Sequence, residues 1–562
     1  MRSASNDRRT RAGYAAKRLH AVSGPETVMM RCPDGVTLAT DIYRPDAPGP
    51  HPVLMMRQPY GRRIASTVVF AHPAWYAAHG YIVAIQDTRG RGDSGGAFRL
   101  FADDICDGAT ALDWAADLRG CNGKVGLYGF SYQGTNQFLA MAGAQARGGK
   151  RPDAIAPTMA AWSIRDDWAY EGGAFRLAGN IGWACQMGAE QARLAGDADA
   201  FAALAATGRG APVGGQRPVM PDALARHAHY THYADWLDDD PAYWDAIAPA
   251  SRLRGDALDV PALHIGGWQD TMLGGTMASH AAFTAAGKAP QRLLVGPWQH
   301  MPWGRNVGAL DLGPEAVSCI DAEQLVFFDA HLRGIGEPPQ GVRLFDLGRK
   351  SWQHYEAAPR AGEAVFYLSS NGLAAATPDD GWLVAEPQHE SADWLVHDPW
   401  RPAPAIGGAT GQPGGLQNRA AIDDRGDVVV YTTSPLAASL TLLGEGMVEL
   451  DVACDRPAHD LYCALSLVSA DGRAMTLSTG FLRVLDSGKP GPRRIPLQGT
   501  FCTVPQGSAL RLSVQAAAWP AFMINPGTST PLPETRLMDC AVTTLRIRHG
   551  GDAVSRLTLP VL

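Results

Sequence analysis

The chain has 562 residues, of which 46% are hydrophobic and 19% are charged, and its formal net charge is -7. This composition supplies enough apolar side chains for buried cores, and at about 100–200 residues per domain it predicts roughly three or four domains. The net negative charge argues against an electrostatic nucleic-acid partner. No apolar stretch resembles a membrane span. We therefore expect neither a nucleic-acid nor a membrane partner.

Targeting signals and cysteine usage both favour the cytoplasm. Residues 1–25 are basic but contain no apolar run long enough for a signal peptide, so we expect a solvated arm. The chain has 9 cysteines and no Cys-x-x-Cys pair, which is typical of reduced thiols rather than of a disulfide framework. The sequence leaves open whether Cys454 and Cys463 pair.

In chain order, the N-terminal part alternates apolar strands with helices. A β-hairpin is expected around the turn Pro33-Asp34-Gly35, between strands at residues 28–31 and 37–43. The next expected elements are strands at 53–57 and 81–86, a helix at 102–118, a strand at 124–128 and a helix at 132–144. Such alternation predicts a mostly parallel sheet with helices on both faces.

The middle of the chain changes character. Residues 146–255 are Ala-rich with interleaved aromatic side chains, and we expect a helical insertion with one strand at 154–159. Alternation resumes with strands at 262–266 and 292–296 and a helix at 321–332.

Helices nearly vanish after residue 346. Short apolar runs are separated there by Gly, Pro, Asp and Ser, a pattern typical of an antiparallel sandwich or jelly roll. The predicted organisation is therefore an α/β domain at 1–145 and 256–346, a helical insertion at 146–255 and a β domain at 347–562.

The segment from Val125 to Gly134 carries the strongest chemical signal. A strand ends, Ser131 follows Gly129 by two residues, and a helix begins at once, which is the strand–turn–helix context of a nucleophilic serine. Gln133 stands two residues after the serine, where the common form of this motif has glycine. The alternative role for Ser131 is a helix N-cap, but the context favours a nucleophile.

A nucleophilic serine needs a base and an orienting acid, which in this context follow in the order Ser, acid, His. Asp270 comes just beyond the strand at 262–266, and His300 comes just beyond the strand at 292–296. A helix N-cap is the alternative for Asp270, and a surface turn residue is the alternative for His300. Their positions at successive strand ends predict a triad with Ser131.

Tyr60 lies just past the third strand, near the edge of the sheet where the triad is expected. Its phenol could stabilise an oxyanion together with the backbone N–H of Tyr132, which follows the serine. The alternative for Tyr60 is a structural aromatic side chain in a turn.

A second serine motif, Gly92-Asp93-Ser94-Gly95-Gly96, resembles the nucleophile signature of chymotrypsin-like proteases. In those proteins the His and Asp precede the serine within a pair of β-barrels, whereas strand–helix alternation surrounds this segment. We therefore expect a Gly-rich loop in which Arg89, Arg91 and Asp93 form structural ion pairs.

Taken together, these motifs resemble the cocaine esterase and X-prolyl dipeptidyl aminopeptidase family of α/β-hydrolases. The serine segment is similar to the family's Gly-x-Ser-Tyr-x-Gly, which accounts for the glycine at 134. The other similar motifs are Gln-Pro-Tyr at 58–60, Gln-Asp-x-Arg-Gly-Arg-Gly at 86–92, Gly-Trp-x-Asp at 267–270 and Gly-Pro-Trp-x-His at 296–300.

The resemblance implies an α/β-hydrolase core, a helical cap inserted in it and a C-terminal jelly roll, over the three segments given above. It implies that Ser131 attacks an ester or amide carbonyl, that His300 transfers the proton and that Asp270 orients the imidazole. Tyr60 and the N–H of Tyr132 would bind the oxyanion. No metal or organic cofactor is expected.

The expected partner is a small-molecule ester or amide substrate. α-Amino acid ester hydrolases, which the chain also resembles, carry carboxylates two and three residues after the catalytic Asp, where this chain has Met272 and Leu273. Carboxylates of the insertion, Asp166, Asp167 and Glu171, could bind a cation, or they could cap helices and form salt bridges. We expect a neutral acyl group, apolar or aromatic. Aromatic residues that could line its pocket are Trp162, Trp168, Tyr170, Trp183, Trp268 and Trp298.

Three functions follow, in order of preference. The first is a serine carboxylesterase, and the second is an amidase, acylase or aminopeptidase that cleaves an amide or X-Pro bond with the same triad. The third is a non-catalytic carbohydrate-binding protein, against which the intact Ser, His and Asp set argues. The sequence does not determine the oligomeric state, and a homo-oligomer is one of the alternatives.

Overall fold

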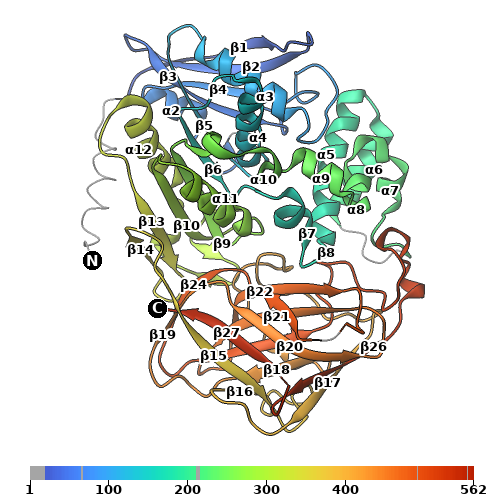
Figure 1. Cartoon of the computed structure of the whole chain (residues 1–562). Coiled ribbons are helices and arrows are strands. Elements are labelled where there is room, and N and C mark those ends of the chain that lie inside the picture. Colours follow the sequence, from blue (N-terminus) through green and yellow to red (C-terminus); the bar gives the residue numbers. More distant parts are fainter. Residues whose placement is uncertain (1–18, 65–66, 211–215, 490, 554) are drawn as a thin grey trace.

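The computed structural model describes residues 19–64, 67–210, 216–489, 491–553 and 555–562. It has an α/β part, a group of helices beside that part and a β-sandwich below both in the view of Figure 1. Most of the basic arm expected at 1–25 lies outside the described residues.

A ten-stranded sheet forms the centre of the α/β part, in the order β1-β2-β4-β3-β5-β6-β9-β10-β13-β14. It begins with the antiparallel hairpin that the Pro-Asp-Gly turn predicts. The strands from β4 to β13 in this order are parallel. The strands are β1 (Val22–Arg31), β2 (Thr37–Pro45), β3 (His51–Gln58), β4 (Ile82–Asp87), β5 (Cys121–Phe130), β6 (Ala154–Thr158), β9 (Ala262–Gln269), β10 (Gln291–Gln299), β13 (Gly341–Asp346) and β14 (Ser351–Tyr355).

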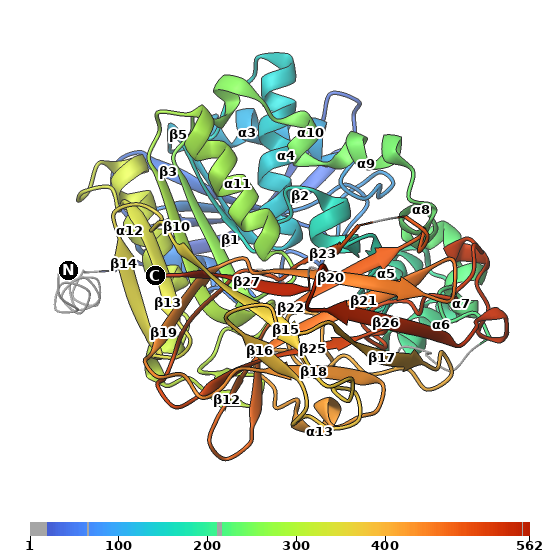
Figure 2. The ribbon, with the colours of Figure 1, turned by 60° about the horizontal axis from the view of Figure 1, so that its bottom comes forward.

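Helices cover both faces of this sheet, which explains why its parallel strands are apolar runs without alternation. One face carries α3 (Asp104–Ala116), α4 (Tyr132–Arg147) and α11 (Leu273–Ala286), which lie together on one side in Figure 2. The other face carries α2 (Pro73–Ala78) and α12 (Ile320–Arg333). The sequence pattern predicts this arrangement correctly.

The helical insertion is shorter than the expected range 146–255. That range includes β6, which is a strand of the sheet because its fully buried residues pair with β5 on one side and with β9 on the other. The insertion therefore lies between β6 and β9. Its helices are a π-helix (Arg165–Ala169), α5 (Leu177–Ala195), α6 (Ala198–Arg209), α7 (Asp222–Arg226), α8 (Tyr233–Asp238), α9 (Pro241–Ile247) and α10 (Pro249–Arg252), and a short hairpin joins β7 (Tyr170–Glu171) to β8 (Ala174–Phe175).

The β domain is a jelly-roll sandwich that begins later than residue 347. β14 still belongs to the ten-stranded sheet, because it pairs antiparallel with β13. The described strands of the sandwich are β15 (Gly362–Ser369), β16 (Trp382–Val384), β17 (Ser391–His397), β18 (Val428–Thr432), β19 (Leu440–Gly444), β20 (Met447–Cys454), β21 (His459–Val468), β22 (Ala474–Val484), β23 (Arg493–Pro496), β24 (Thr500–Val504), β25 (Ala509–Gln515), β26 (Thr543–His549) and β27 (Arg556–Val561). One apolar core continues from this sandwich into the α/β part through Trp268, Leu273 and Leu293.

Two smaller predictions concern thiols and membranes. Cys454 and Cys463 are both free in the structure, so they do not pair. Among the described residues, no helix combines the length and apolar character needed to cross a membrane.

Candidate active site

Ser131 stands at the sharp turn between β5 and α4, with φ of 60° and ψ of -124°. A non-glycine residue rarely adopts positive φ, and such strain is typical of functional sites. The turn is tight on both sides. A Cβ at Gly129 would lie 2.5 Å from Cβ of Gln133, and a Cβ at Gly134 would lie 2.9 Å from the carbonyl oxygen of Thr158. Both positions therefore require glycine: Gly129 leaves room for the side chain of Gln133, and Gly134 lets α4 approach the end of β6.

The structure brings Ser131, His300 and Asp270 together. Nε2 of His300 lies 3.0 Å from Oγ of Ser131, and Nδ1 of His300 lies 2.8 Å from Oδ1 of Asp270. The three side chains follow β5, β10 and β9, whose parallel carboxyl ends lie near one another in the sheet. Asp270 is fully buried, whereas the His300 side chain is 30% exposed. The imidazole can therefore be reached from outside, whereas the carboxylate is screened from water and Ser131 is only 5% exposed.

Tyr60 follows β3 at the same edge of the sheet. Its hydroxyl oxygen accepts a hydrogen bond from Nε1 of Trp183, at 3.1 Å, so the cap helix α5 helps to place it. Burial raises the pKa of Tyr60 to about 12, so at neutral pH the phenol keeps its proton and is able to donate it in a hydrogen bond.

Tyr132 contributes its backbone and its side chain in different ways. It is the first residue of α4, where backbone N–H groups have no partner within the helix. Its hydroxyl donates to Oδ2 of Asp104 at 2.6 Å, and its ring stacks on Phe101 with centroids 4.2 Å apart. The side chain of Tyr132 is thus engaged by Asp104 and Phe101, so the oxyanion role predicted for Tyr132 falls to its backbone N–H alone.

Three of the predicted pocket residues gather above Tyr60. Trp168 and Trp183 are half-buried with ring centroids 4.4 Å apart, and Tyr170 belongs to the same apolar cluster. Tyr170 is itself buried, and its hydroxyl donates to the carbonyl of Trp236 at 2.9 Å. Trp168 and Trp183 are therefore the two of these rings that stay partly exposed, and their part in a substrate pocket remains a prediction.

The other three predicted pocket residues lie elsewhere. Trp162 packs on Phe138 and Phe283 against the sheet. Trp298 is fully buried and donates from Nε1 to the carbonyl of Ala316 at 2.6 Å. Trp268 is 3% exposed and donates to the carbonyl of Phe345 at 2.8 Å. A buried indole needs a partner for its N–H, and these carbonyls hold Trp268 and Trp298 in the core rather than at the serine.

The Gly-rich loop after β4 holds the expected ion pairs with one exception. Arg89 pairs with Asp107, and Asp93 pairs with Arg62, each at 2.7 Å. Arg91 is buried and instead donates to the carbonyl of Pro59 at 2.7 Å and to the carbonyl of Met187 at 3.1 Å. It thereby ties the segment before Tyr60 to cap helix α5, a role that no local sequence signal indicates.

A second side-chain set from the β domain, Ser370, Asp393 and His549, superficially resembles a triad. Nε2 of His549 lies 3.0 Å from Oγ of Ser370 and 3.1 Å from Oδ2 of Asp393, so one ring nitrogen faces both partners. All three residues are fully buried. This arrangement cannot relay a proton through the ring or reach a substrate, and it is a structural network. No group of three or more His, Cys, Asp or Glu within the described part of the chain is arranged to hold a metal ion.

The fold and the site define a serine hydrolase of the α/β-hydrolase class. The family model for X-Pro dipeptidyl-peptidase (S15 family) matches residues 34–302, and the model for the X-Pro dipeptidyl-peptidase C-terminal non-catalytic domain matches residues 334–558. The chain is 32% identical to the cocaine esterase of Rhodococcus sp. (strain MB1 Bresler), over 95% of this chain and 98% of that protein. The chain belongs to the S15 family of X-Pro dipeptidyl-peptidases and related esterases.

Solved structures share the whole architecture. An aminopeptidase from a marine sediment Thaumarchaeota archaeon superimposes with a TM-score of 0.78 at 20% identity, covering 96% of each chain. An α-amino acid ester hydrolase superimposes with a TM-score of 0.74 at 21% identity, covering 97% of each chain. At such identities the likeness concerns the fold.

Proposed function

We propose that this protein is a serine carboxylesterase in which Ser131 is the nucleophile. The observation that carries the proposal is the continuous series of contacts from Ser131 through His300 to Asp270, at 3.0 and 2.8 Å. His300 takes the hydroxyl proton as Oγ attacks the ester carbonyl, and Asp270 stabilises the imidazolium. The proton then passes to the leaving alcohol as the C–O bond breaks. Water, activated by the same imidazole, releases the acid from Ser131.

The charge that develops on the carbonyl oxygen falls between two donors. In this proposal the Tyr60 hydroxyl and the backbone N–H of Tyr132 bind the oxyanion. Donors that are held in place before the reaction contribute most, at about 3–4 kcal/mol for one well-placed donor. The contact from Trp183 to the Tyr60 hydroxyl supports this role, because it occupies a lone pair of the phenol oxygen and leaves its proton free to point at the oxyanion.

The acyl group that suits this site is neutral and apolar or aromatic. Trp168 and Trp183 offer half-buried rings next to Tyr60. The positions two and three residues after Asp270 are Met272 and Leu273, both buried, so no carboxylate stands there to hold a substrate ammonium. Among the cap carboxylates, Asp166 pairs with Arg165 at 2.7 Å and Glu171 pairs with Arg176 at 3.1 Å.

An aminopeptidase or amidase is the second candidate, favoured by the family model that matches residues 34–302 and by the archaeal aminopeptidase of the same fold. The two functions differ in the leaving group, because an amine must be protonated to depart and an alkoxide need not be. Comparison of an ester with the matching anilide therefore separates them.

The test compares p-nitrophenyl benzoate with the matching benzoyl anilide and with an alanyl-prolyl anilide, on the full chain and on Ser131→Ala. We expect ester turnover, fluorophosphonate labelling at Ser131, and loss of both in the variant by at least about 10⁴-fold. Labelling of Ser131 together with anilide turnover equal to that of the ester would support the second candidate. Absence of labelling and of turnover in the folded protein would refute both.

We also propose that the protein works in the cytoplasm. All nine cysteines are free, including the buried Cys185, Cys463 and Cys502, which suits a reducing compartment. Fractionation of the source cells, with thiol labelling of the recovered protein, tests this. Recovery from an exported fraction would contradict it.

A further inference from the structure

Arg91 carries a buried positive charge close to Tyr60. Its side chain is 1% exposed, and its Nε donates to the carbonyl oxygen of Pro59 at 2.7 Å. That carbonyl belongs to the peptide group that joins Pro59 to Tyr60, and the N–H of the same peptide group donates to Oε1 of Gln58 at 2.9 Å. Side chains from β3 and from the loop after β4 therefore hold both polar ends of the peptide group through which the chain enters Tyr60.

The other partners of the Arg91 side chain are neutral. Its Nη1 donates to the carbonyl oxygen of Met187 and to Oε1 of Gln191, each at 3.1 Å. The guanidinium carbon lies 4.8 Å from the ring centroid of Phe98. Within the part of the chain that the structure describes, no carboxylate forms an ion pair with Arg91. Because a guanidinium stays protonated in proteins, Arg91 brings an unpaired positive charge into the interior.

The carboxylates around Arg91 are engaged by other arginines. Burial lowers the pKa of Arg91, and Glu190 and Asp87 oppose this effect from beyond ion-pair distance. Glu190 pairs with Arg193 at 2.8 Å, and Asp87 pairs with Arg62 at 2.7 Å. Burial of an unpaired charge costs folding free energy that neutral hydrogen bonds return only in part. A negative charge that develops near Tyr60 would be stabilised by this guanidinium.

Tyr60 is the side chain through which this charge acts. Burial raises the pKa of Tyr60 to about 12, whereas the indole N–H of Trp183 and the positive charge of Arg91 both act to lower it. A positive charge near a phenol favours its anionic form and so makes the hydroxyl a stronger hydrogen-bond donor. The same charge attracts the negative charge that forms on a carbonyl oxygen under attack. Both effects favour the charged intermediate over the neutral ester.

We propose that Arg91 is a positioning residue for the oxyanion site, which fixes the peptide group before Tyr60 and stabilises the oxyanion with its buried, unpaired positive charge. This rests on the proposed function, in which Ser131 attacks an ester and Tyr60 donates to the oxyanion. Arg91 is not itself a catalytic residue, because its hydrogen bonds go to the main chain and to Gln191. It contributes to kcat rather than to substrate affinity, since its charge meets a negative partner only during the reaction.

The test begins with the hydrolysis of p-nitrophenyl benzoate by two variants. Arg91→Met removes the charge and keeps an unbranched side chain. We expect it to lower kcat about tenfold to thirtyfold with KM nearly unchanged, as for a charge interaction at an intermediate dielectric constant. Arg91→Lys keeps the charge and should stay within about threefold of the unsubstituted protein. Gln191→Leu, the matched control, removes one contact of the same guanidinium but leaves its charge, and should retain kcat within about twofold.

Phenylboronic acid gives a second measurement that a purely structural role would not change. Its boron bonds to Oγ of Ser131 and becomes a tetrahedral anion while the hydroxyl proton passes to His300, so the complex carries the charge of the intermediate. We expect Arg91→Met to weaken the inhibition constant of phenylboronic acid by the same factor as kcat. Acetophenone, a neutral competitor with a carbonyl group, should keep its inhibition constant within about twofold.

Two results would overturn the proposal. One is an equal loss of kcat in Arg91→Met and Arg91→Lys, and the other is an equal change of the two inhibition constants in Arg91→Met. If Arg91→Met fails to fold, Arg91→Gln gives the same comparison, because it keeps a donor without the charge. Absence of turnover and of fluorophosphonate labelling in the unsubstituted protein would refute the proposed function instead. Turnover in that protein with unchanged kcat in Arg91→Met would refute only the role of Arg91.

Discussion

Gln498, from the loop after β23 of the sandwich, donates from Nε2 to the main-chain oxygen of Asp270 at 3.0 Å and to that of Trp268 at 2.9 Å. The segment that carries the proposed catalytic acid is therefore held by a different domain. The carboxylate of Asp270 is fully buried, and its Oδ1 lies 2.8 Å from the imidazole of His300. A small shift of this segment would alter the orientation of the imidazole.

Replacement of Gln498 should therefore affect turnover more than substrate affinity. Gln498→Leu removes two hydrogen bonds that hold the segment carrying Asp270. Because the imidazole would then be oriented less well, we expect kcat to fall about tenfold, which corresponds to about 1.4 kcal/mol in the activation barrier, with KM nearly unchanged. Steady-state kinetics over a range of pH checks this. Gln353→Leu, on β14, is the control and should retain full activity. A parallel loss of activity and folded protein would instead show a purely structural role.

The pair formed by Trp183 and Tyr60 gives a second prediction. Tyr60→Phe should lower kcat by about 10²–10³, the cost of one oxyanion donor. Trp183→Phe keeps an aromatic ring but removes the indole N–H that lies 3.1 Å from the hydroxyl, and should lower kcat about threefold to tenfold. In the Tyr60→Phe background, Trp183→Phe should have no further effect. Additive losses in this double-mutant cycle would show that the indole acts independently of the hydroxyl.

A variant of Tyr132 distinguishes the role of its backbone N–H from that of its side chain. Tyr132→Phe keeps the backbone N–H but leaves Oδ2 of the buried Asp104 without its 2.6 Å partner. We expect the free energy of unfolding to fall by about 1–3 kcal/mol, while kcat stays within about twofold. Urea denaturation and kinetics at one pH measure both. A hundredfold fall in kcat with unchanged stability would contradict the assignment of the backbone as the donor.

Substitution of Gly134 tests how tightly the turn at Ser131 is packed. A Cβ at this position would lie 2.9 Å from the Thr158 oxygen and 2.9 Å from Cβ of Ala160, so Gly134→Ala should displace the turn and cost about 1–3 kcal/mol of stability together with activity. Gly179→Ala, in helix α5 where the new Cβ meets nothing, should instead be neutral or stabilising by about 0.5–1 kcal/mol. Thermal unfolding and turnover of both variants check this. Equal stability of the two would refute the steric argument.

The buried His264 contributes to the loss of stability in acid. Burial, and next the neighbouring His280, lower the pKa of His264 to about 3, whereas an unfolded histidine titrates near 6.5. Between about pH 6.5 and 3 the unfolded chain binds a proton that the folded chain does not. The contribution of His264 to the free energy of unfolding is therefore fully present above pH 6.5. As the pH falls below 6.5, this contribution declines by up to about 1.4 kcal/mol per pH unit.

Urea denaturation of the full chain at pH 7, 6 and 5 measures this decline. His264→Gln should show a shallower decline than the full chain, whatever its stability at pH 7. A variant with an unchanged slope would contradict the role of His264.

The sequence by itself determines the local parts of the site. The apolar run of β5, the serine after it and the helix that follows are adjacent in the chain, so their pattern identifies the turn at Ser131. Asp270 and His300 are recognisable for the same reason, because each follows a strand directly. The parallel order of the sheet then brings strand ends together at one edge, which is a general property of this class of fold.

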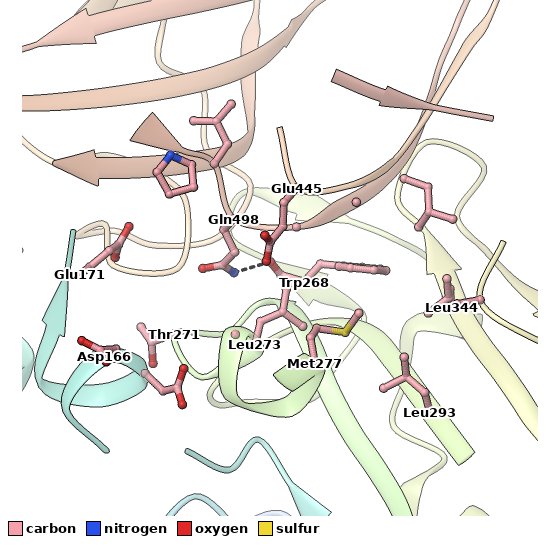
Figure 3. A pocket seen from close by; sticks show the side chains of 18 of the residues that line it. Asp166, Glu171, Trp268, Thr271, Leu273, Met277, Leu293, Leu344, Glu445 and Gln498 are labelled. Atoms are coloured by element: carbon pink, nitrogen blue, oxygen red, sulfur yellow. Dashed lines mark hydrogen bonds between the residues drawn. The ribbon is translucent and has the colours of Figure 1, made fainter. Parts of the chain in front are cut away.

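Only the tertiary structure decides contacts between segments that are far apart in the chain. Residue 498 is 228 positions from Asp270, and no local pattern relates them. The directions of Trp268 and Trp298 depend on which carbonyls their indoles meet, and the place of β6 depends on pairing with both β5 and β9. A cavity of about 430 Å³, lined among others by Asp167, Trp268 and Glu445, exists because three domains pack around it (Figure 3). That packing is set by long-range contacts, which local periodicity does not encode.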